Sequence, residues 1–198
     1  MTDTPSLVFF AGSAREDSVN KKIARVAAAT AAAADARATL IDLRDYPMPL
    51  YDGDLEEREG LPEAAVELKA LLRDSDGFFI ASPEYNSSLP PLLKNTIDWV
   101  SRRETADEPP LAAYKGKVAA IAAGSPGGLG GMRVLVALRM LLGNIGVHVV
   151  PQQLAIAGAP GVFDDNGHLT DANHTRALEG VVGQLVDTAS ALKHESGS

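Results

Sequence analysis

Five short apolar runs, none of them broken by regular polar alternation, constrain the fold of this 198-residue chain more than any other feature. Such runs are typical of strands that are buried on both faces, and the segments between them carry apolar residues at helical spacing. The predicted strands are residues 7–11, 38–43, 77–81, 118–123 and 147–150. Five alternations of strand and helix predict an α/β fold, with a doubly wound parallel sheet between two layers of helices.

Helix signals follow each predicted strand. The alanine-rich segment 19–34 favours a helix, with Ser18 as its N-cap. Pro90 and Pro91 suit the first turn of another helix, which includes Val100, and Gly143-Asn144 is a signal for the end of the helix that begins at Met132. The other predicted helices are residues 62–75 and 171–192.

The remaining segments are predicted to be loops. Proline and glycine punctuate residues 46–54, Asn166-Gly167 signals a turn, and residues 104–114 carry prolines and acidic side chains that are typical of a solvated connection. Charged side chains without an evident partner are expected to be solvated. These are Lys21, Lys22, Glu56, Glu57 and Glu59.

Composition excludes several kinds of site. The chain has no cysteine, which excludes disulfides, thiolate metal sites and thiol catalysis. A formal net charge of -8 argues against a general nucleic-acid or anionic-membrane surface, but it allows one basic pocket for a phosphate. The histidines lack metal-ligand spacing, so no metal site is expected. Without a signal segment or an apolar run of about 20 residues, we expect a cytoplasmic protein and no membrane partner.

Polar residues and glycines gather in the loops after the first, third and fourth predicted strands. In a parallel sheet these loops emerge at one edge, where ligands bind in the crevice at which the strand order reverses. After the first strand, Ser13, Arg15, Ser18 and Asn20 surround a helix N-terminus, whose N–H groups favour a phosphate together with the arginine fork. The alternative for this loop is an ordinary capped helix with a surface arginine.

The loop after the third strand, Ser82-Pro83-Glu84-Tyr85-Asn86-Ser87-Ser88, is difficult to explain as solvated filler, because its prolines restrict the backbone and would preorganise its amide groups. The glycine-rich loop 124–131 lets a backbone approach a flat ligand, although a flexible turn without a ligand is the alternative. Its spacing does not fit a dinucleotide fingerprint. Together the three loops predict a site for a planar ligand that carries a phosphate.

Three motifs in these loops resemble those of the NADPH-dependent FMN reductases, a flavodoxin-like family that includes chromate, quinone and azo-dye reductases. The motifs are Gly12-Ser13-x-Arg15-x-x-Ser18-x-Asn20, Ser82-Pro83-Glu84-Tyr85-Asn86-x-Ser88-x-Pro90-x-x-Leu93-Lys94-Asn95-x-Ile97-Asp98-Trp99 and Ser125-x-Gly127-Gly128-x-Gly130-Gly131. The middle motif is highly specific, whereas the other two are weak alone. The resemblance covers residues 6–192, and it implies a flavodoxin-like three-layer sandwich with strand order 2-1-3-4-5 in one domain of residues 1–198.

The resemblance also implies a cofactor and its site. FMN would be bound, and NADPH or NADH would be the co-substrate. The implied cofactor-binding residues are Ser13, Arg15, Ser18 and Asn20 for the phosphate, Pro83, Glu84, Tyr85 and Asn86 for the isoalloxazine ring, largely through backbone groups, and Ser125, Gly127 and Gly128 for its pyrimidine side. Relatives are homodimers or homotetramers in which the helix corresponding to 90–103 packs at the subunit interface, near the loop corresponding to 51–55.

Several functions stay open. The flavin carries the hydride chemistry, so no catalytic side chain is assigned. Electrons would pass from NAD(P)H through FMN to quinone-like, azo or metal-oxyanion acceptors, or to free FMN for a partner monooxygenase. A flavin-binding electron carrier or redox sensor needs the same pocket. A nicotinamide-dinucleotide dehydrogenase would place Asp42 on the ribose hydroxyls, but without the glycine fingerprint Asp42 is expected to cap a loop.

Overall fold

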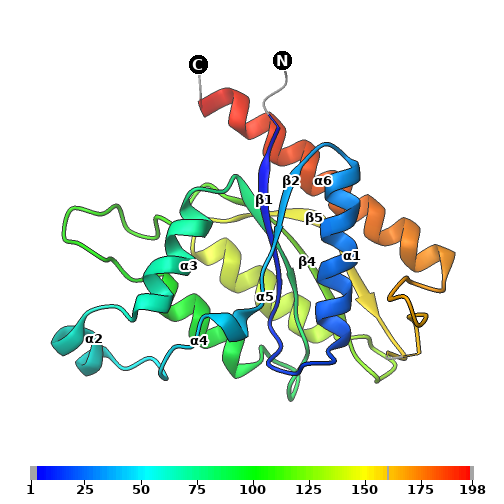
Figure 1. Ribbon diagram of the computed structural model, residues 1–198, viewed down its shortest axis with the longest axis horizontal. Helices are drawn as coiled ribbons and strands as arrows, with labels where there is room; N and C mark the ends of the chain where they lie inside the picture. Colours follow the sequence, from blue (N-terminus) through cyan, green and yellow to red (C-terminus); the bar gives the residue numbers. More distant parts are fainter. Residues whose placement is uncertain (1–3, 160, 197–198) are drawn as a thin grey trace.

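A parallel sheet of five strands runs through the middle of the protein in the order β2-β1-β3-β4-β5, in a computed structural model that describes residues 4–159 and 161–196 (Figure 1). The strands are β1 (Ser6–Ala11), β2 (Arg37–Leu40), β3 (Gly77–Ala81), β4 (Val118–Gly124) and β5 (His148–Ile156). The order and the parallel pairing confirm the predicted flavodoxin-like sheet. Because the strands are parallel, the loops that follow them leave the sheet at one edge.

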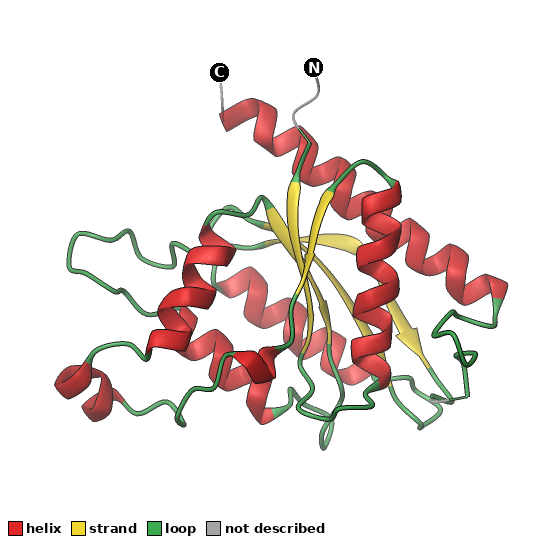
Figure 2. Ribbon diagram, viewed as in Figure 1, coloured by secondary structure: helices red, strands yellow, loops and turns green. Residues whose placement is uncertain are grey.

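Helices cover both faces of the sheet (Figure 2). One layer consists of α1 (Val19–Ala33) and α6 (Ala172–Ser196), and the other of α3 (Glu63–Arg73), α4 (Pro91–Val100) and α5 (Met132–Asn144). Alternate residues of β1 serve the two layers, since Phe9 packs in the core under α1 and α6 and Phe10 in the core on the opposite face. The unbroken apolar runs therefore correspond to strands with two buried faces.

β5 is longer than its apolar run predicts. The run ends at Val150, but the strand continues through Pro151, which is tolerated because β5 is an edge strand. The register between β4 and β5 shifts there, as in a β-bulge. The guanidinium of Arg139 on α5 donates to the carbonyl oxygens of Val149 and Val150 at 3.2 and 2.9 Å, and so pairs backbone groups beside the irregularity.

β2 is shorter than predicted. It ends at Leu40, residues 41 and 42 have no regular structure, and a 3₁₀ turn, η1 (Leu43–Asp45), begins at the last predicted strand residue. The Asp42 carboxylate accepts from Arg44 N at 3.0 Å and pairs with Lys21 Nζ at 2.5 Å. The prediction that Asp42 caps a loop is confirmed, whereas the prediction that Lys21 is a solvated cation was wrong.

A short helix, α2 (Gly53–Glu59), follows the segment predicted to be a loop, and the sequence did not signal it. Glu56 on this helix is not solvated. Its carboxylate accepts from the Tyr51 hydroxyl and from Arg102 Nε, both at 2.9 Å. The expectation of a solvated side chain was wrong because Arg102, just after α4, reaches Glu56 only in the folded chain.

The connection between α4 and β4 is exposed over residues 104–107, 109 and 110, as predicted, but it is anchored at two points. Lys69 on α3 is buried, and its ammonium donates to the Glu108 carboxylate and to the Arg102 carbonyl. Tyr114, at the end of the connection, is also buried and lies edge-on to Phe78. The prediction failed only at these anchors, because proline and acidic residues do not reveal a buried partner on another helix.

The ends of two later elements also differ from their predictions. α5 continues through Gly143-Asn144, because Gly146 is the residue that takes the left-handed conformation after the helix, with φ +83°. α6 extends to Ser196. The turn at Asn166-Gly167 is confirmed by a hydrogen bond from Gly167 N to Asp164 O of 3.0 Å. No helix in the described part of the chain is long and apolar enough to cross a membrane.

Candidate active site

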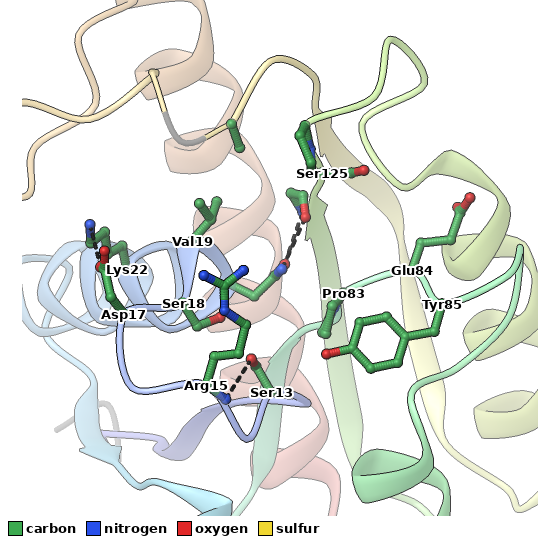
Figure 3. A pocket seen from close by; sticks show the side chains of 14 residues that line it. Ser13, Arg15, Asp17, Ser18, Val19, Lys22, Pro83, Glu84, Tyr85 and Ser125 are labelled. Carbon is green, nitrogen blue, oxygen red and sulfur yellow. Dashed lines mark hydrogen bonds and ion pairs between the residues drawn. The ribbon is translucent and has the colours of Figure 1, made fainter.

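Loops after β1, β3, β4 and β5 surround a cavity of about 380 Å³ at the carboxyl edge of the sheet (Figure 3). This volume lies in the range of about 300–1,000 Å³ that is usual for small-molecule and cofactor sites. The lining residues are Ser13, Arg15, Asp17, Ser18, Val19, Asn20, Lys22, Pro83, Glu84, Tyr85, Gly124, Ser125, Pro126 and Ala159. The crevice predicted where the strand order reverses is therefore present.

The N-terminus of α1 meets this cavity without a side-chain cap. Ser18 occupies the N-cap position, but its hydroxyl makes no capping hydrogen bond, and the first turn contains no acidic side chain. The N–H groups of that turn are left without a side-chain acceptor, at the positive end of the helix dipole. Ser13 and Ser18 are both buried beside it. This end of the cavity suits an anion.

Arg15 adds a positive charge to the same end. Its backbone N donates to Ser13 Oγ at 3.3 Å, and Figure 3 shows its guanidinium directed over the cavity. Within the described residues that guanidinium makes no hydrogen bond or ion pair, so it can bind a ligand. Lys22, which was expected to be solvated, also lines the cavity and pairs with Asp17 at 2.7 Å. The hydrogen bond from Lys22 holds the pKa of the Asp17 carboxyl below its usual value.

Asn20 joins α1 to the end of β4. Its carboxamide donates to Gly124 O at 3.0 Å and accepts from Gly124 N at 2.9 Å, and the residue is 3% exposed. A Cβ on Gly124 would come within 2.7 Å of Val19 Cγ1 and 2.9 Å of Ile23 Cδ1, so a larger residue there would require these side chains to move. Asn20 lies where it was predicted, but the bridge to Gly124 uses its carboxamide, and its role as a phosphate ligand stays a prediction.

Pro83, Glu84 and Tyr85 form the wall opposite α1. Figure 3 shows the Tyr85 ring directed across the cavity toward Ser13, whereas the Glu84 carboxylate points away from the cavity toward α5. Tyr85 is 44% exposed, so its ring has a free face. This wall suits a flat ligand.

A tight turn follows Tyr85. Asn86 and Ser87 have φ values of +52° and +66°, and the backbones of Tyr85 and Ser88 exchange hydrogen bonds of 3.1 and 3.0 Å. Two consecutive positive φ values are typical of a two-residue type I′ turn. The turn carries Asn86 out of the lining of the cavity.

The glycine-rich loop after β4 contributes Ser125 and Pro126 to the lining. The Ser125 hydroxyl accepts from Gly127 N at 3.3 Å, and the Ser125 carbonyl accepts from Ala159 N at 3.2 Å. Ser125 therefore connects this loop to the one that follows β5.

Some glycines of this loop are required by the packing of the protein itself. Gly127 and Gly128, which were predicted to contact the cofactor, are exposed and do not line the cavity. Gly130 has φ +61°, and a Cβ there would lie 2.7 Å from the Ile156 carbonyl carbon. The close approach of this loop to β5 thus requires glycine at position 130, for which only a place in the glycine-rich motif was predicted.

Most predicted site residues are brought together, and those outside the lining are Asn86, Gly127 and Gly128. The lining residues without a predicted role are Asp17, Val19, Lys22, Gly124, Pro126 and Ala159. Most of these are sequence neighbours of predicted residues and could have been found by extending each motif by a turn. Ala159 follows β5, and its loop was not considered because the predicted strand ended too early.

An anion site and a wall for a flat ligand thus share one cavity at the switch point of a parallel sheet. The fold and this cavity define the class as an α/β protein that binds a phosphate-bearing cofactor. The sequence profile of the NADPH-dependent FMN reductases matches residues 5–161, and the chain belongs to that family. It is accordingly an oxidoreductase with FMN as its cofactor.

Individual relatives agree with this assignment. A quinone reductase of Escherichia coli (strain K12) is 38% identical over 142 residues, which are 72% of this chain and 71% of the relative. A quinone reductase of Pseudomonas putida is 34% identical over 172 residues, 86% and 88% of the two chains. Among solved structures, FerB, a flavoenzyme NAD(P)H:(acceptor) oxidoreductase from Paracoccus denitrificans, matches with a TM-score of 0.80 at 28% identity, over 95% of this chain and 98% of that one.

The residues of the cavity fit FMN. The uncapped end of α1, the buried hydroxyls of Ser13 and Ser18 and the unpaired guanidinium of Arg15 suit a phosphate. The exposed ring of Tyr85 suits the flat isoalloxazine.

Proposed function

We propose that this protein oxidises NAD(P)H and passes the electrons through FMN, held between α1 and Tyr85, to a quinone-like acceptor. The observation that carries the proposal is the uncapped N-terminus of α1 facing the wall of Pro83 and Tyr85 across one cavity. Bound FMN would supply the hydride and electron chemistry. The names of the relatives that are quinone reductases support the class of acceptor.

The chain's own residues bind and orient the cofactor in this proposal. Its phosphate is held by α1 and by Ser13, Arg15, Ser18 and Asn20, and its ring by Pro83, Glu84, Tyr85 and Asn86 with Ser125, Gly127 and Gly128 on the pyrimidine side. Asn86, Gly127 and Gly128 lie outside the lining, so they contact only ligand atoms that extend beyond it. No side chain acts as a catalytic acid or base.

The test is to purify the protein, add FMN, record the visible spectrum and measure oxidation of NADPH and of NADH. Quinone, azo, chromate and free FMN are compared as acceptors. We expect a yellow protein with quinone-dependent turnover. A protein that takes up no FMN contradicts the proposal, and tight FMN binding without turnover on any acceptor identifies an electron carrier or redox sensor instead.

We also propose that the protein is a homodimer or homotetramer. α5 exposes Met132, Val136 and Met140, which are 53%, 66% and 73% exposed at successive turns and form an apolar stripe that a second copy could cover. α4, the helix that the family resemblance places at an interface, carries an exposed ion pair of Lys94 with Asp98 at 2.7 Å. Light scattering during gel filtration tests the proposal, and a monomer at every concentration contradicts it.

We propose further that residues 1–198 form one FMN-binding domain that acts in the cytoplasm, where NAD(P)H would be its electron donor. A single cooperative unfolding transition is expected, with FMN raising its midpoint. Activity that fractionates with periplasm or membranes contradicts the location.

A further inference from the structure

The side chain of Glu84 caps a helix that belongs to another loop of the site. Its Oε2 accepts from Arg133 N at 3.0 Å and from Val134 N at 3.1 Å. These are the second and third residues of α5, whose N–H groups a local N-cap side chain normally satisfies. The N-cap of α5 is Gly131, and its first turn has no acidic residue. The β3 loop therefore supplies the missing cap from 49 and 50 residues away.

This contact, which we call the Glu84 clamp, is shielded and reinforced. The Glu84 side chain is 12% exposed, and its Oε1 lies 3.8 Å from the Arg133 guanidinium. The same guanidinium reaches Ser87 Oγ at 3.4 Å. A carboxylate at a helix N-terminus compensates the positive end of the dipole, most strongly where it is partly buried.

The clamp joins two walls of the cavity. Pro83 and Tyr85 flank Glu84 on the β3 loop, while Ser125 and Pro126 lie on the loop that leads into α5. The Glu84 carboxylate thus connects the loop after β3 to the loop after β4, and the proposed position of the isoalloxazine ring lies between these two loops. It also makes the two helix ends at this site differ, since α1 is uncapped and α5 is neutralised.

We propose that Glu84 is a positioning residue that fixes the separation of the two loops holding the isoalloxazine ring and cancels the positive end of α5 beside it. The role rests on the proposed function, because it assumes FMN in this cavity. A fixed separation favours binding, since little ordering remains when the ring enters. Cancelling the positive end of α5 removes a field that would stabilise the negative charge of the reduced ring, and so lowers the reduction potential.

Two variants distinguish the effect of the Glu84 hydrogen bonds on the loops from the effect of the Glu84 charge. Glu84→Gln keeps the shape and an acceptor oxygen but removes the charge, whereas Glu84→Ala removes both. Glu179→Gln is the matched control, because Glu179 is exposed on α6 and does not line the cavity. We expect Glu84→Ala to weaken binding of oxidised FMN by about tenfold, measured by flavin fluorescence. In Glu84→Gln we expect the ratio of the Kd for oxidised FMN to the Kd for reduced FMN to rise about tenfold, because the reduced ring gains the positive end of α5. This ratio corresponds to a rise of about 30 mV in the two-electron reduction potential of bound FMN.

The clamp has a readout that needs no flavin. Amide exchange of Arg133 and Val134 in the flavin-free protein should accelerate in Glu84→Ala and stay unchanged in Glu179→Gln. Unchanged exchange in Glu84→Ala overturns the clamp. Accelerated exchange with unaltered FMN affinity and midpoint in both Glu84 variants overturns the positioning role and leaves the proposed function intact.

Two further outcomes concern FMN binding by the wild type and folding of Glu84→Ala. A wild type that binds no FMN overturns the proposed function and this role with it, while the exchange result still decides whether the clamp exists. If Glu84→Ala does not fold, the conservative Glu84→Gln supplies the test, and a midpoint equal to that of Glu179→Gln overturns the proposal.

Discussion

The side chain of Asn20 and the backbone of Gly124 exchange hydrogen bonds of 3.0 and 2.9 Å across 104 residues of sequence. They join the first turn of α1 to the last residue of β4, and both residues line the cavity. The end of the cavity that suits an anion is thereby fixed to the sheet by the fold itself.

Replacing Asn20 should therefore destabilise the protein whether or not FMN is present. Asn20→Leu keeps the size but leaves the N–H and C=O of Gly124 without these partners, and we expect the free energy of unfolding to fall by about 2–4 kcal/mol. Urea unfolding of the flavin-free protein measures the effect. Asn144→Ala, at an exposed position, is the control and should change it by about 0.5 kcal/mol or less. Equal stability of the two variants would show that the bridge contributes nothing.

Arg15 should matter for FMN and not for folding. Arg15→Ala removes the unpaired guanidinium at the cavity, and we expect FMN binding to weaken by about 1.5–3 kcal/mol, the range for a hydrogen bond to a charged group. Fluorescence titration measures it. Arg25→Ala is the matched control, since Arg25 is an exposed arginine on α1 that does not line the cavity. Unchanged FMN affinity of Arg15→Ala would place the phosphate elsewhere.

Ser87 sits in a backbone conformation that suits glycine better. Its φ of +66° is the second of two positive values in the turn after Tyr85. Ser87→Gly relieves the left-handed strain of about 1–2 kcal/mol but loses about 0.5–1 kcal/mol to chain entropy, so we expect a stability gain of up to about 1.5 kcal/mol. Ser87→Val should destabilise, because a β-branched residue tolerates positive φ poorly. Thermal unfolding in which valine equals glycine would contradict this reading of the turn.

The contact of Lys69 with Glu108 should make stability depend on acid pH. Burial by itself raises the pKa of the Glu108 carboxyl, but the hydrogen bonds from Lys69 and from Glu104 N, at 2.7 Å, together with the Lys69 charge hold that pKa below its usual value. A lowered carboxyl pKa contributes stability that is present above the unfolded pKa of about 4.3 and is lost as pH falls through the folded value.

We therefore expect the free energy of unfolding to fall more steeply below about pH 4.3 in the wild type than in Glu108→Gln. Urea unfolding at several pH values measures both slopes. Glu179→Gln, which changes an exposed carboxylate, should keep the wild-type slope. Parallel slopes for wild type and Glu108→Gln would contradict the role of this contact.

Local sequence signals were sufficient to predict those parts of the structure that depend on residues close together in the chain. The strands β1, β3 and β4 follow from runs such as Gly77–Ala81, because a strand buried on both faces excludes polar residues from its whole length. The start of α4 at Pro91 follows from the fixed φ of proline. The motif residues Ser13, Arg15 and Tyr85 were found because loops after parallel strands share one edge.

Signals failed where a partner is distant in sequence. Glu56 was expected to be solvated, but Arg102 reaches it after folding. β5 was expected to end at Val150, because nothing local shows that an edge strand with an irregular register can accept Pro151. The role of Asn20 at a phosphate stays a prediction, but local signals did not indicate its two hydrogen bonds to Gly124, which form only when β4 lies beside α1.

Burial patterns and motifs within a few residues of each other are sufficient to predict the sheet, its helical layers and the loops that carry the site. The use of each side chain in those loops depends on contacts that form only in the folded chain. Glu84 is the clearest case, because its place in the motif indicates a residue of the ring wall, while its carboxylate is bound to the backbone of Arg133 and Val134. A hydrogen bond requires a donor at a definite distance and angle, and here the pairing of β3 with β4 and the packing of α5 against β4 and β5 set both.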